Sequence, residues 1–169
     1  MSILNITFSD FGKGKFELHG GIYEQPKIQS YIDKFEKRYL LKLFGAELFG
    51  LFESDLSNGQ PQTQRFVDVF ESFDYDDGCR IVSSDGIIEM LKGFIYFEYV
   101  RDLISQMSVN GNVKPVGENS ETIQMFETTL LTRYNDAVMN FQNIQKFMCD
   151  NSSNYREFNG VGVRTIYWS

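Results

Sequence analysis

The residues best suited to chemistry in this chain are few and stand far apart. His19 is the only histidine, and no cysteine or second histidine lies nearby with which it could share a metal ion. Cys79 and Cys149 lack the close spacing of a metal site, so we interpret them as free thiols in a reducing compartment. No serine occurs in a Gly-x-Ser-x-Gly setting. These residue types predict no nucleophilic, acid–base or metal catalysis.

Two glycine-containing stretches resemble phosphate-binding loops only superficially. Residues 12–15, Gly-Lys-Gly-Lys, lack the Gly-x-x-x-x-Gly-Lys-Ser/Thr spacing of a P-loop. Residues 160–162, Gly-Val-Gly, lack the third glycine and the following helix of a dinucleotide-binding turn. The sequence therefore predicts a protein that is not an enzyme and that carries no cofactor and no metal.

The one acidic cluster lies in the stretch DYDDGCRIVSSDG, residues 74–86. An EF-hand loop that began at Asp74 would need a ligand at position 78 and a glycine at 79, where the chain has Gly78 and Cys79. We favour a solvated acidic turn, with weak divalent-ion binding as the alternative. The interpretation ranked last is a metal-dependent nuclease that would use four carboxylates. They are Asp74, Asp76, Asp77 and Asp85.

Charge and hydropathy narrow the class of protein further. The net charge of −7 and the pI of about 4.7 disfavour sequence-specific nucleic-acid binding, which needs a basic face, but they suit a wall beside nucleic acid. Asp33 and Glu36 are interpreted as solvated charges on a helix face. The N-terminus has no signal-peptide pattern, and no stretch approaches the ~20 apolar residues of a membrane span, so we expect no membrane partner.

The hydrophobic spacing predicts a mainly α fold of one domain. A helix is expected from Pro26, with a break at Gly45 and an end at residues 57–59, and Pro61 is expected to start a short helix. Residues 74–86 are expected to form a loop. Two further helices are expected, one over 86–107 and a long one that ends near residue 150, joined by a turn-rich connection over 108–121.

The stretch GFIYFEYVRD, residues 93–102, is apolar on nearly every side of a helix. Such a helix is normally buried all round, so we expect it to stand at the centre of a helical bundle. The tyrosine hydroxyls of this bundle then need polar partners, and we expect Glu98 and Arg101 to supply some of them.

Both ends of the chain differ from the helical core, residues 26–150. Residues 1–25 are expected to form an extended or β arm, and residues 151–169 a tail that either docks on another protein or folds back on its own helices. Because apolar residues at termini commonly make protein–protein contacts, ten residues are candidate partner contacts. They are Phe8, Phe11, Phe16, Tyr155, Phe158, Val161, Val163, Ile166, Tyr167 and Trp168.

The order of these parts over residues 26–150 resembles the head–tail connector, or adaptor, proteins of tailed bacteriophages, in the version found in Bacteroides phages, crAss-like phages included. The most specific elements are Tyr99-Val100-Arg101-Asp102 at the end of the aromatic helix, then Val113-Lys114-Pro115 and Glu118-Asn119-Ser120.

This resemblance implies a structural virion protein. The family assembles as a ring, expected to be a dodecamer, beneath the portal protein; it contacts tail or other neck proteins and lines the channel through which DNA leaves the head. The expected location is the head–tail junction of the virion, and the host cytoplasm during assembly. The alternative is a small phage regulatory or inhibitory protein that binds a host protein.

Overall fold

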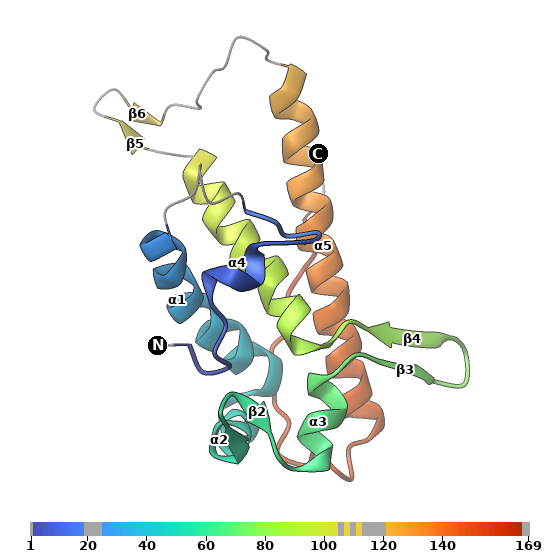
Figure 1. The fold of residues 1–169 in the computed structure, drawn as a ribbon. Coiled ribbons are helices and arrows are strands. Elements are labelled where there is room, and N and C mark those ends of the chain that lie inside the picture. The colour runs from blue at the N-terminus through green and yellow to red at the C-terminus, as the bar shows by residue number, and fades with distance from the viewer. Residues whose placement is uncertain (1, 19–24, 105–106, 109–110, 113–120, 167–169) are drawn as a thin grey trace.

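The computed structural model describes residues 2–18, 25–104, 107–108, 111–112 and 121–166 (Figure 1). Helices carry most of this part of the chain, which confirms the expected mainly α fold. The helices are α1 (Gln25–Phe44), α2 (Ala46–Asp55), α3 (Gln64–Phe70), α4 (Gly86–Ile104) and α5 (Glu121–Asp150), with a short 3-10 turn, η1 (Phe8–Phe11). The strands are β1 (Leu56–Ser57), β2 (Gln60–Pro61), β3 (Phe73–Asp76), β4 (Ile81–Ser84), β5 (Met107–Ser108) and β6 (Gly111–Asn112), and they pair as three antiparallel hairpins.

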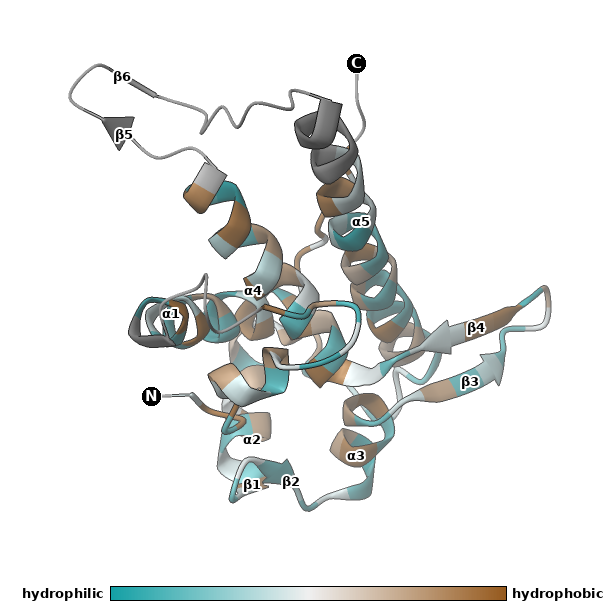
Figure 2. Cartoon of the chain, turned by 45° about the horizontal axis from the view of Figure 1, so that its top comes forward, coloured by the Kyte–Doolittle hydropathy of each residue, from teal (hydrophilic) through white to brown (hydrophobic). Residues whose placement is uncertain are grey.

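Helix α4 is the centre of the bundle, as its sequence predicts. It lies between α1 and α5 and also contacts α3 (Figure 1). Every residue from 93 to 100 is buried. By contrast α5 is amphipathic, and Figure 2 shows hydrophobic and hydrophilic residues alternating along it. A helix without a polar face gains most by burial on all sides, because each exposed apolar side would cost free energy in water.

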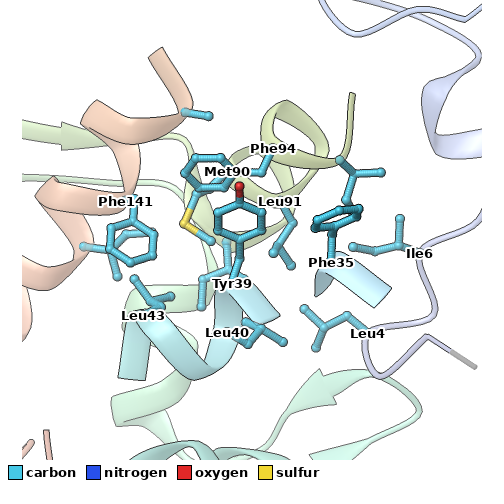
Figure 3. Close-up of a cluster of buried hydrophobic side chains, with 14 of the residues drawn as sticks. Leu4, Ile6, Phe35, Tyr39, Leu40, Leu43, Met90, Leu91, Phe94 and Phe141 are labelled. Atoms are coloured by element: carbon cyan, nitrogen blue, oxygen red, sulfur yellow. The ribbon is translucent and has the colours of Figure 1, made fainter. Parts of the chain in front are cut away.

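Stacked aromatic rings join α1, α4 and α5. The ring of Tyr39 lies 4.0 Å from that of Phe94 and is nearly parallel to it (Figure 3). The rings of Tyr134 and Phe141 meet Phe94 edge-on. The Tyr39 hydroxyl donates to Glu98 Oε1 at 2.9 Å. Burial, followed by the nearby Glu98 carboxylate, raises the pKa of Tyr39, so the hydroxyl keeps its proton as the donor.

Glu98 has a second partner in Arg101. The guanidinium Nη2 of Arg101 lies 2.6 Å from Glu98 Oε2, so both carboxylate oxygens of this buried side chain are satisfied. The expectation that Glu98 would serve a tyrosine is therefore confirmed for Tyr39 of α1. On α4 itself, the Tyr96 hydroxyl instead accepts a hydrogen bond from Arg133 at 2.7 Å.

The breaks between helices follow local chemistry. Gly45 separates α1 from α2 with a φ of 79°, a conformation that glycine adopts without strain, so the predicted break is confirmed. The short helix α3 starts at Gln64, not at Pro61 as expected, and Pro61 lies in β2. The reason is Asp55, whose Oδ2 accepts the backbone N–H groups of Gln62 and Thr63 and so holds this segment outside the helix.

The N-terminal arm folds over the bundle. Within residues 2–18 it forms the turn η1 and no strand, so a β-hairpin is not found in that range. Leu4 and Ile6 approach Phe35 and Leu40 of α1 (Figure 3). Because these side chains belong to the same hydrophobic cluster as the helices, the arm is part of the core.

Glu36 holds the start of this arm, and its interpretation as a solvated charge is wrong. Its side chain is 1% exposed. It accepts hydrogen bonds from the backbone N–H groups of Ile3 and Leu4, at 2.8 Å each, and from the Ser2 hydroxyl at 3.0 Å. Burial raises the pKa of Glu36, and the three donors oppose that rise. A buried carboxylate is tolerated when donors surround it in this way.

Candidate interaction surfaces

A β-hairpin projects from the helical body, in the segment expected to be a loop. Strands β3 and β4 pair antiparallel from Phe73 opposite Ser84 to Asp76 opposite Ile81, and the hairpin extends away from the helices (Figure 1). Its base packs on α5, where the Phe147 ring lies 4.7 Å from that of Phe73 and 5.2 Å from that of Tyr75. This contact reaches across more than seventy residues, and a local pattern gives no signal of it.

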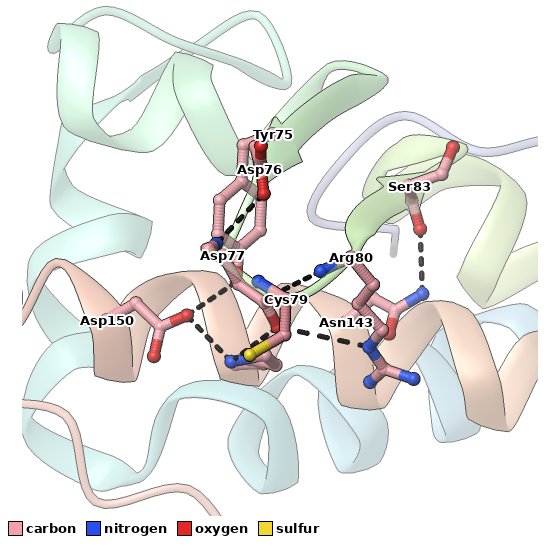
Figure 4. Close-up of polar contacts among 10 residues, drawn as sticks. Tyr75, Asp76, Asp77, Cys79, Arg80, Ser83, Asn143 and Asp150 are labelled. Carbon is pink, nitrogen blue, oxygen red and sulfur yellow. Dashed lines mark hydrogen bonds and ion pairs between the residues drawn. The ribbon is translucent and has the colours of Figure 1, made fainter.

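Polar contacts fix the tip of the hairpin to α5 (Figure 4). Lys146 Nζ lies 3.1 Å from Asp77 Oδ2 and 2.9 Å from Asp150 Oδ2, and the Tyr75 hydroxyl donates to Asp150 at 2.8 Å. Asn143 donates to the carbonyl of Ser83 at 2.7 Å. Burial and then the hydrogen bond to Asp150 raise the pKa of Tyr75 to about 12.

The acidic cluster builds the turn between the strands. Asp76 Oδ1 accepts the N–H of Gly78, and Asp77 Oδ1 accepts the N–H groups of Cys79 and Arg80, all at 2.9 Å. These bonds lower the pKa of Asp77 to about 2, with help from Lys146. Across the ranges that the structure describes, no cluster of three or more His, Cys, Asp or Glu is arranged to hold a metal. These contacts favour the turn over an ion site.

The state of Asp77 gives a pH prediction. Because its pKa is lowered, its ionised form stabilises the turn above pH 3.8, the ordinary value, and this contribution is lost as pH falls towards 2. We expect carbon NMR shifts to show Asp77 still ionised at pH 3.8. Lys146→Met should raise the pKa part of the way, since the backbone donors remain, and Lys37→Met on the exposed face of α1 should not change it. A wild-type midpoint near 3.8 would mean that the turn bonds do not form.

The outward face of the hairpin exposes one large apolar side chain, Ile81, among Asp74, Asp76 and Ser83. Ile81 on β4 is 73% exposed, and hydrophobic colour reaches the outer end of this strand (Figure 2). Met139 on α5 is 58% exposed. Met139 lines an open hollow of about 290 Å³ together with Ser83, which shares the outward face of β4 with Ile81. Burial alternates along β4, with Ile81 and Ser83 exposed and Val82 and Ser84 buried, but the sequence Ile-Val-Ser-Ser does not alternate, so the residue pattern gives no signal of this face.

The predicted contact residues of the N-terminal arm lie mostly in the chain's own core. Phe11 is 0% exposed and Phe16 is 4% exposed, whereas Phe8 is partly buried against the same cluster. Phe11 and Phe16 are thus covered in this conformation, and their assignment as partner contacts stays a prediction that requires the arm to leave the bundle. The arm turns back at η1, which places both rings on the bundle.

The tail takes the second of its two predicted alternatives and folds back on its own helices. Tyr155 is 2% exposed and Val163 is 8% exposed, so neither is a free contact; Phe158 is partly buried. Val161 is 64% exposed and Ile166 is 39% exposed, so both remain candidate partner contacts. Tyr167 and Trp168 lie outside the described residues, as does His19.

The remaining candidates for chemistry stay separate from one another. Cys79 at the hairpin tip and Cys149 near the end of α5 are both exposed free thiols. Asp85 lines the hollow beside Lys15 and Asp136, away from the turn that Asp77 builds. The structure therefore does not bring together the four carboxylates that a nuclease reading would need.

The comparisons with known proteins do not indicate a function for this chain. Comparison with models of known families, with curated proteins and with solved structures found no match. Within the described ranges, none of the helices combines the length and the apolar character needed to cross a bilayer.

Proposed function

We propose that this chain is a structural virion protein, a head–tail connector subunit that forms a ring beneath the portal of a tailed phage. The observation that carries the proposal is the β3–β4 hairpin, whose Ile81 is 73% exposed; Met139 on α5 is also exposed, at 58%. An exposed apolar side chain on a hairpin can anchor a protein–protein contact when a partner pocket buries it. The helical bundle over residues 26–150 fits the resemblance, and the net charge of −7 suits a channel that DNA passes without adhering.

This proposal places the subunit contacts on the hairpin instead of the buried ends. The hairpin is a two-stranded sheet whose β4 edge is partly covered by Asn143 of α5, so the outer edge of β3 is the one to which a strand of a neighbour can be added. Its turn is stiffened by Asp76 and Asp77, so little order must be gained on binding. The portal and the tail or other neck proteins would occupy the two faces of the ring, in the virion and, during assembly, in the host cytoplasm.

A substitution on the hairpin tests the proposal. Ile81→Asp should weaken self-association at least about tenfold, since loss of a central apolar anchor commonly costs more than about 1.4 kcal/mol. Ile81→Val keeps an apolar β-branched side chain and should assemble as the wild type does. Light scattering measures the size of the assembly, with and without a portal ring encoded in the same genome, and electron microscopy shows whether it is a ring. Circular dichroism checks that both variants fold.

The second candidate is a small phage regulatory or inhibitory protein that binds a host protein. The burial of Phe11, Phe16, Tyr155 and Val163 within one chain favours it, because a chain with both described ends folded inwards can stay monomeric. A wild-type chain that remains a monomer at high concentration and does not bind portal rings would overturn the connector proposal in favour of this one.

A further inference from the structure

The C-terminal tail lies as an extended segment across the end of α1 and then along α5 (Figure 1). The N–H of Asn159 donates to the Phe44 carbonyl at 3.2 Å, and that of Val161 donates to the Lys42 carbonyl at 2.7 Å. These carbonyls are at the end of a helix, where no intrahelical donor reaches them. The tail therefore supplies donors that α1 itself lacks.

Side chains of α5 hold the next part of the tail by its backbone. Gln142 donates to the Val163 carbonyl at 3.0 Å, and the Tyr134 hydroxyl donates to the Arg164 carbonyl at 3.3 Å. Asn135 makes two bonds to one residue, donating to the carbonyl of Ile166 at 2.8 Å and accepting its N–H at 2.9 Å. We call Asn135, Gln142 and the carbonyls of Lys42 and Phe44 the tail-binding surface.

This surface recognises main chain, with only one tail side chain used as an anchor. Val163 is 8% exposed, whereas Val161 is 64% exposed and Ile166 is 39% exposed. Backbone bonds supply affinity without demanding particular side chains, as in the addition of a strand to a sheet edge. Since apolar burial is the main force that keeps a segment on a protein, this part of the tail is held weakly relative to the core.

Gly160 determines how closely the tail can approach α1 and α5. A Cβ added at Gly160 would lie 2.2 Å from the Leu43 carbonyl oxygen and 2.6 Å from Gln145 Nε2, closer than atoms can approach. A Cβ added at Gly162 would meet nothing within 4 Å. The tail-binding surface therefore requires glycine at position 160 of an extended peptide but not at position 162.

Tyr155 anchors the chain just before this segment. It is 2% exposed and its hydroxyl donates to the Arg65 carbonyl, while Glu157 pairs with the Arg65 guanidinium at 3.3 Å. Residues 159–166 can therefore leave the surface while Tyr155 stays in place. The four residues from Tyr155 to Asn159 extend to about 13–14 Å, so the exchange requires the α1 end of the adjacent copy within this distance of Tyr155.

We propose that the tail-binding surface takes the tail of a second copy of this chain, so that neighbouring subunits exchange residues 159–166. A second copy is the occupant that fits, because it carries the same glycine at position 160 and the same Val163 anchor. Exchange of an identical segment keeps every contact of the closed form and adds a link between subunits. This inference rests on the proposed self-association and names a contact that completes it.

Isotope mixing with a photoreactive tail tests the exchange on the full chain. Val161, which is exposed, is replaced by p-benzoylphenylalanine, and this chain is mixed with ¹⁵N-labelled wild type before irradiation. Exchange predicts cross-links from the unlabelled tail to the labelled α1 peptide that contains Lys42, in a fraction that rises with concentration. Cross-links confined to unlabelled pairs at every concentration would overturn the exchange.

Matched alanine variants sharpen the test. Gly160→Ala in the photoreactive chain should reduce the mixed-isotope product at least about tenfold, whereas Gly162→Ala should leave it unchanged. Equal yields from the two variants would overturn the assigned fit. Light scattering on the same samples separates the two proposals. Rings that show only same-chain cross-links overturn the exchange and leave the connector proposal standing, and monomers that show only same-chain cross-links overturn both.

Discussion

Phe94→Ala is expected to lower the free energy of unfolding by about 3–5 kcal/mol, the range for truncating a buried phenylalanine. Phe94 is 0% exposed and is enclosed by the rings of Tyr39, Tyr134 and Phe141. The truncation leaves a cavity between three helices that cannot collapse without moving all of them. Chemical denaturation followed by circular dichroism measures the change.

Phe73→Ala is the matched control for this prediction. Phe73 is also a ring in an aromatic cluster, but it lies partly exposed at the base of the hairpin. Its truncation should cost less than half as much, because the lost side chain is partly replaced by water. Equal losses for the two variants would mean that α4 is not the centre of the bundle.

Glu36→Ala is expected to cost about 3 kcal/mol and to loosen the N-terminal arm. The change leaves the N–H groups of Ile3 and Leu4 without their acceptor, and each unsatisfied buried donor costs about 1–3 kcal/mol. We expect the free energy of unfolding to fall and the amide protons of residues 3–6 to exchange faster with solvent. Hydrogen exchange followed by NMR measures the second effect.

Two further variants test whether the loss belongs to the carboxylate at position 36. Glu53→Ala removes an exposed carboxylate from α2 and should change stability by less than about 0.5 kcal/mol. Glu36→Gln keeps the size and one acceptor oxygen but turns an N–H donor towards the backbone donors of the arm, so its loss should be large as well. If Glu36→Ala behaved like Glu53→Ala, the arm would not be held by this carboxylate.

The helices were accessible to sequence analysis because helical periodicity is local. The apolar stretch at residues 93–102 predicted the burial of α4, and the hydrophobic spacing predicted a long helix that ends near residue 150, which is α5 with its end at Asp150. The break between α1 and α2 was likewise predicted from a single residue, Gly45. In each case the residues that set the structure lie within a few turns of one another.

The hairpin escaped prediction because its determinants are distant. Residues 74–86 contain Gly78 and four aspartates, which favours a loop when read alone. The strands form against Phe147, and Lys146 of α5 completes the turn through Asp77. The candidate contact at Ile81 was not predicted either. Its exposure follows from its position on the outward face of β4, and no strand was expected there.

By itself, the sequence determined the helical class, the central helix and the position of the helix break, since these follow from the spacing of neighbouring side chains. Only the tertiary structure decided that Glu36 is buried and that the tail packs on its own helices. Glu36 sits among charged neighbours in sequence, yet its donors come from residues more than thirty positions away. Whether the tail folds back depends on a close approach between Gly160 and Leu43, and such packing becomes defined only when the helices are assembled.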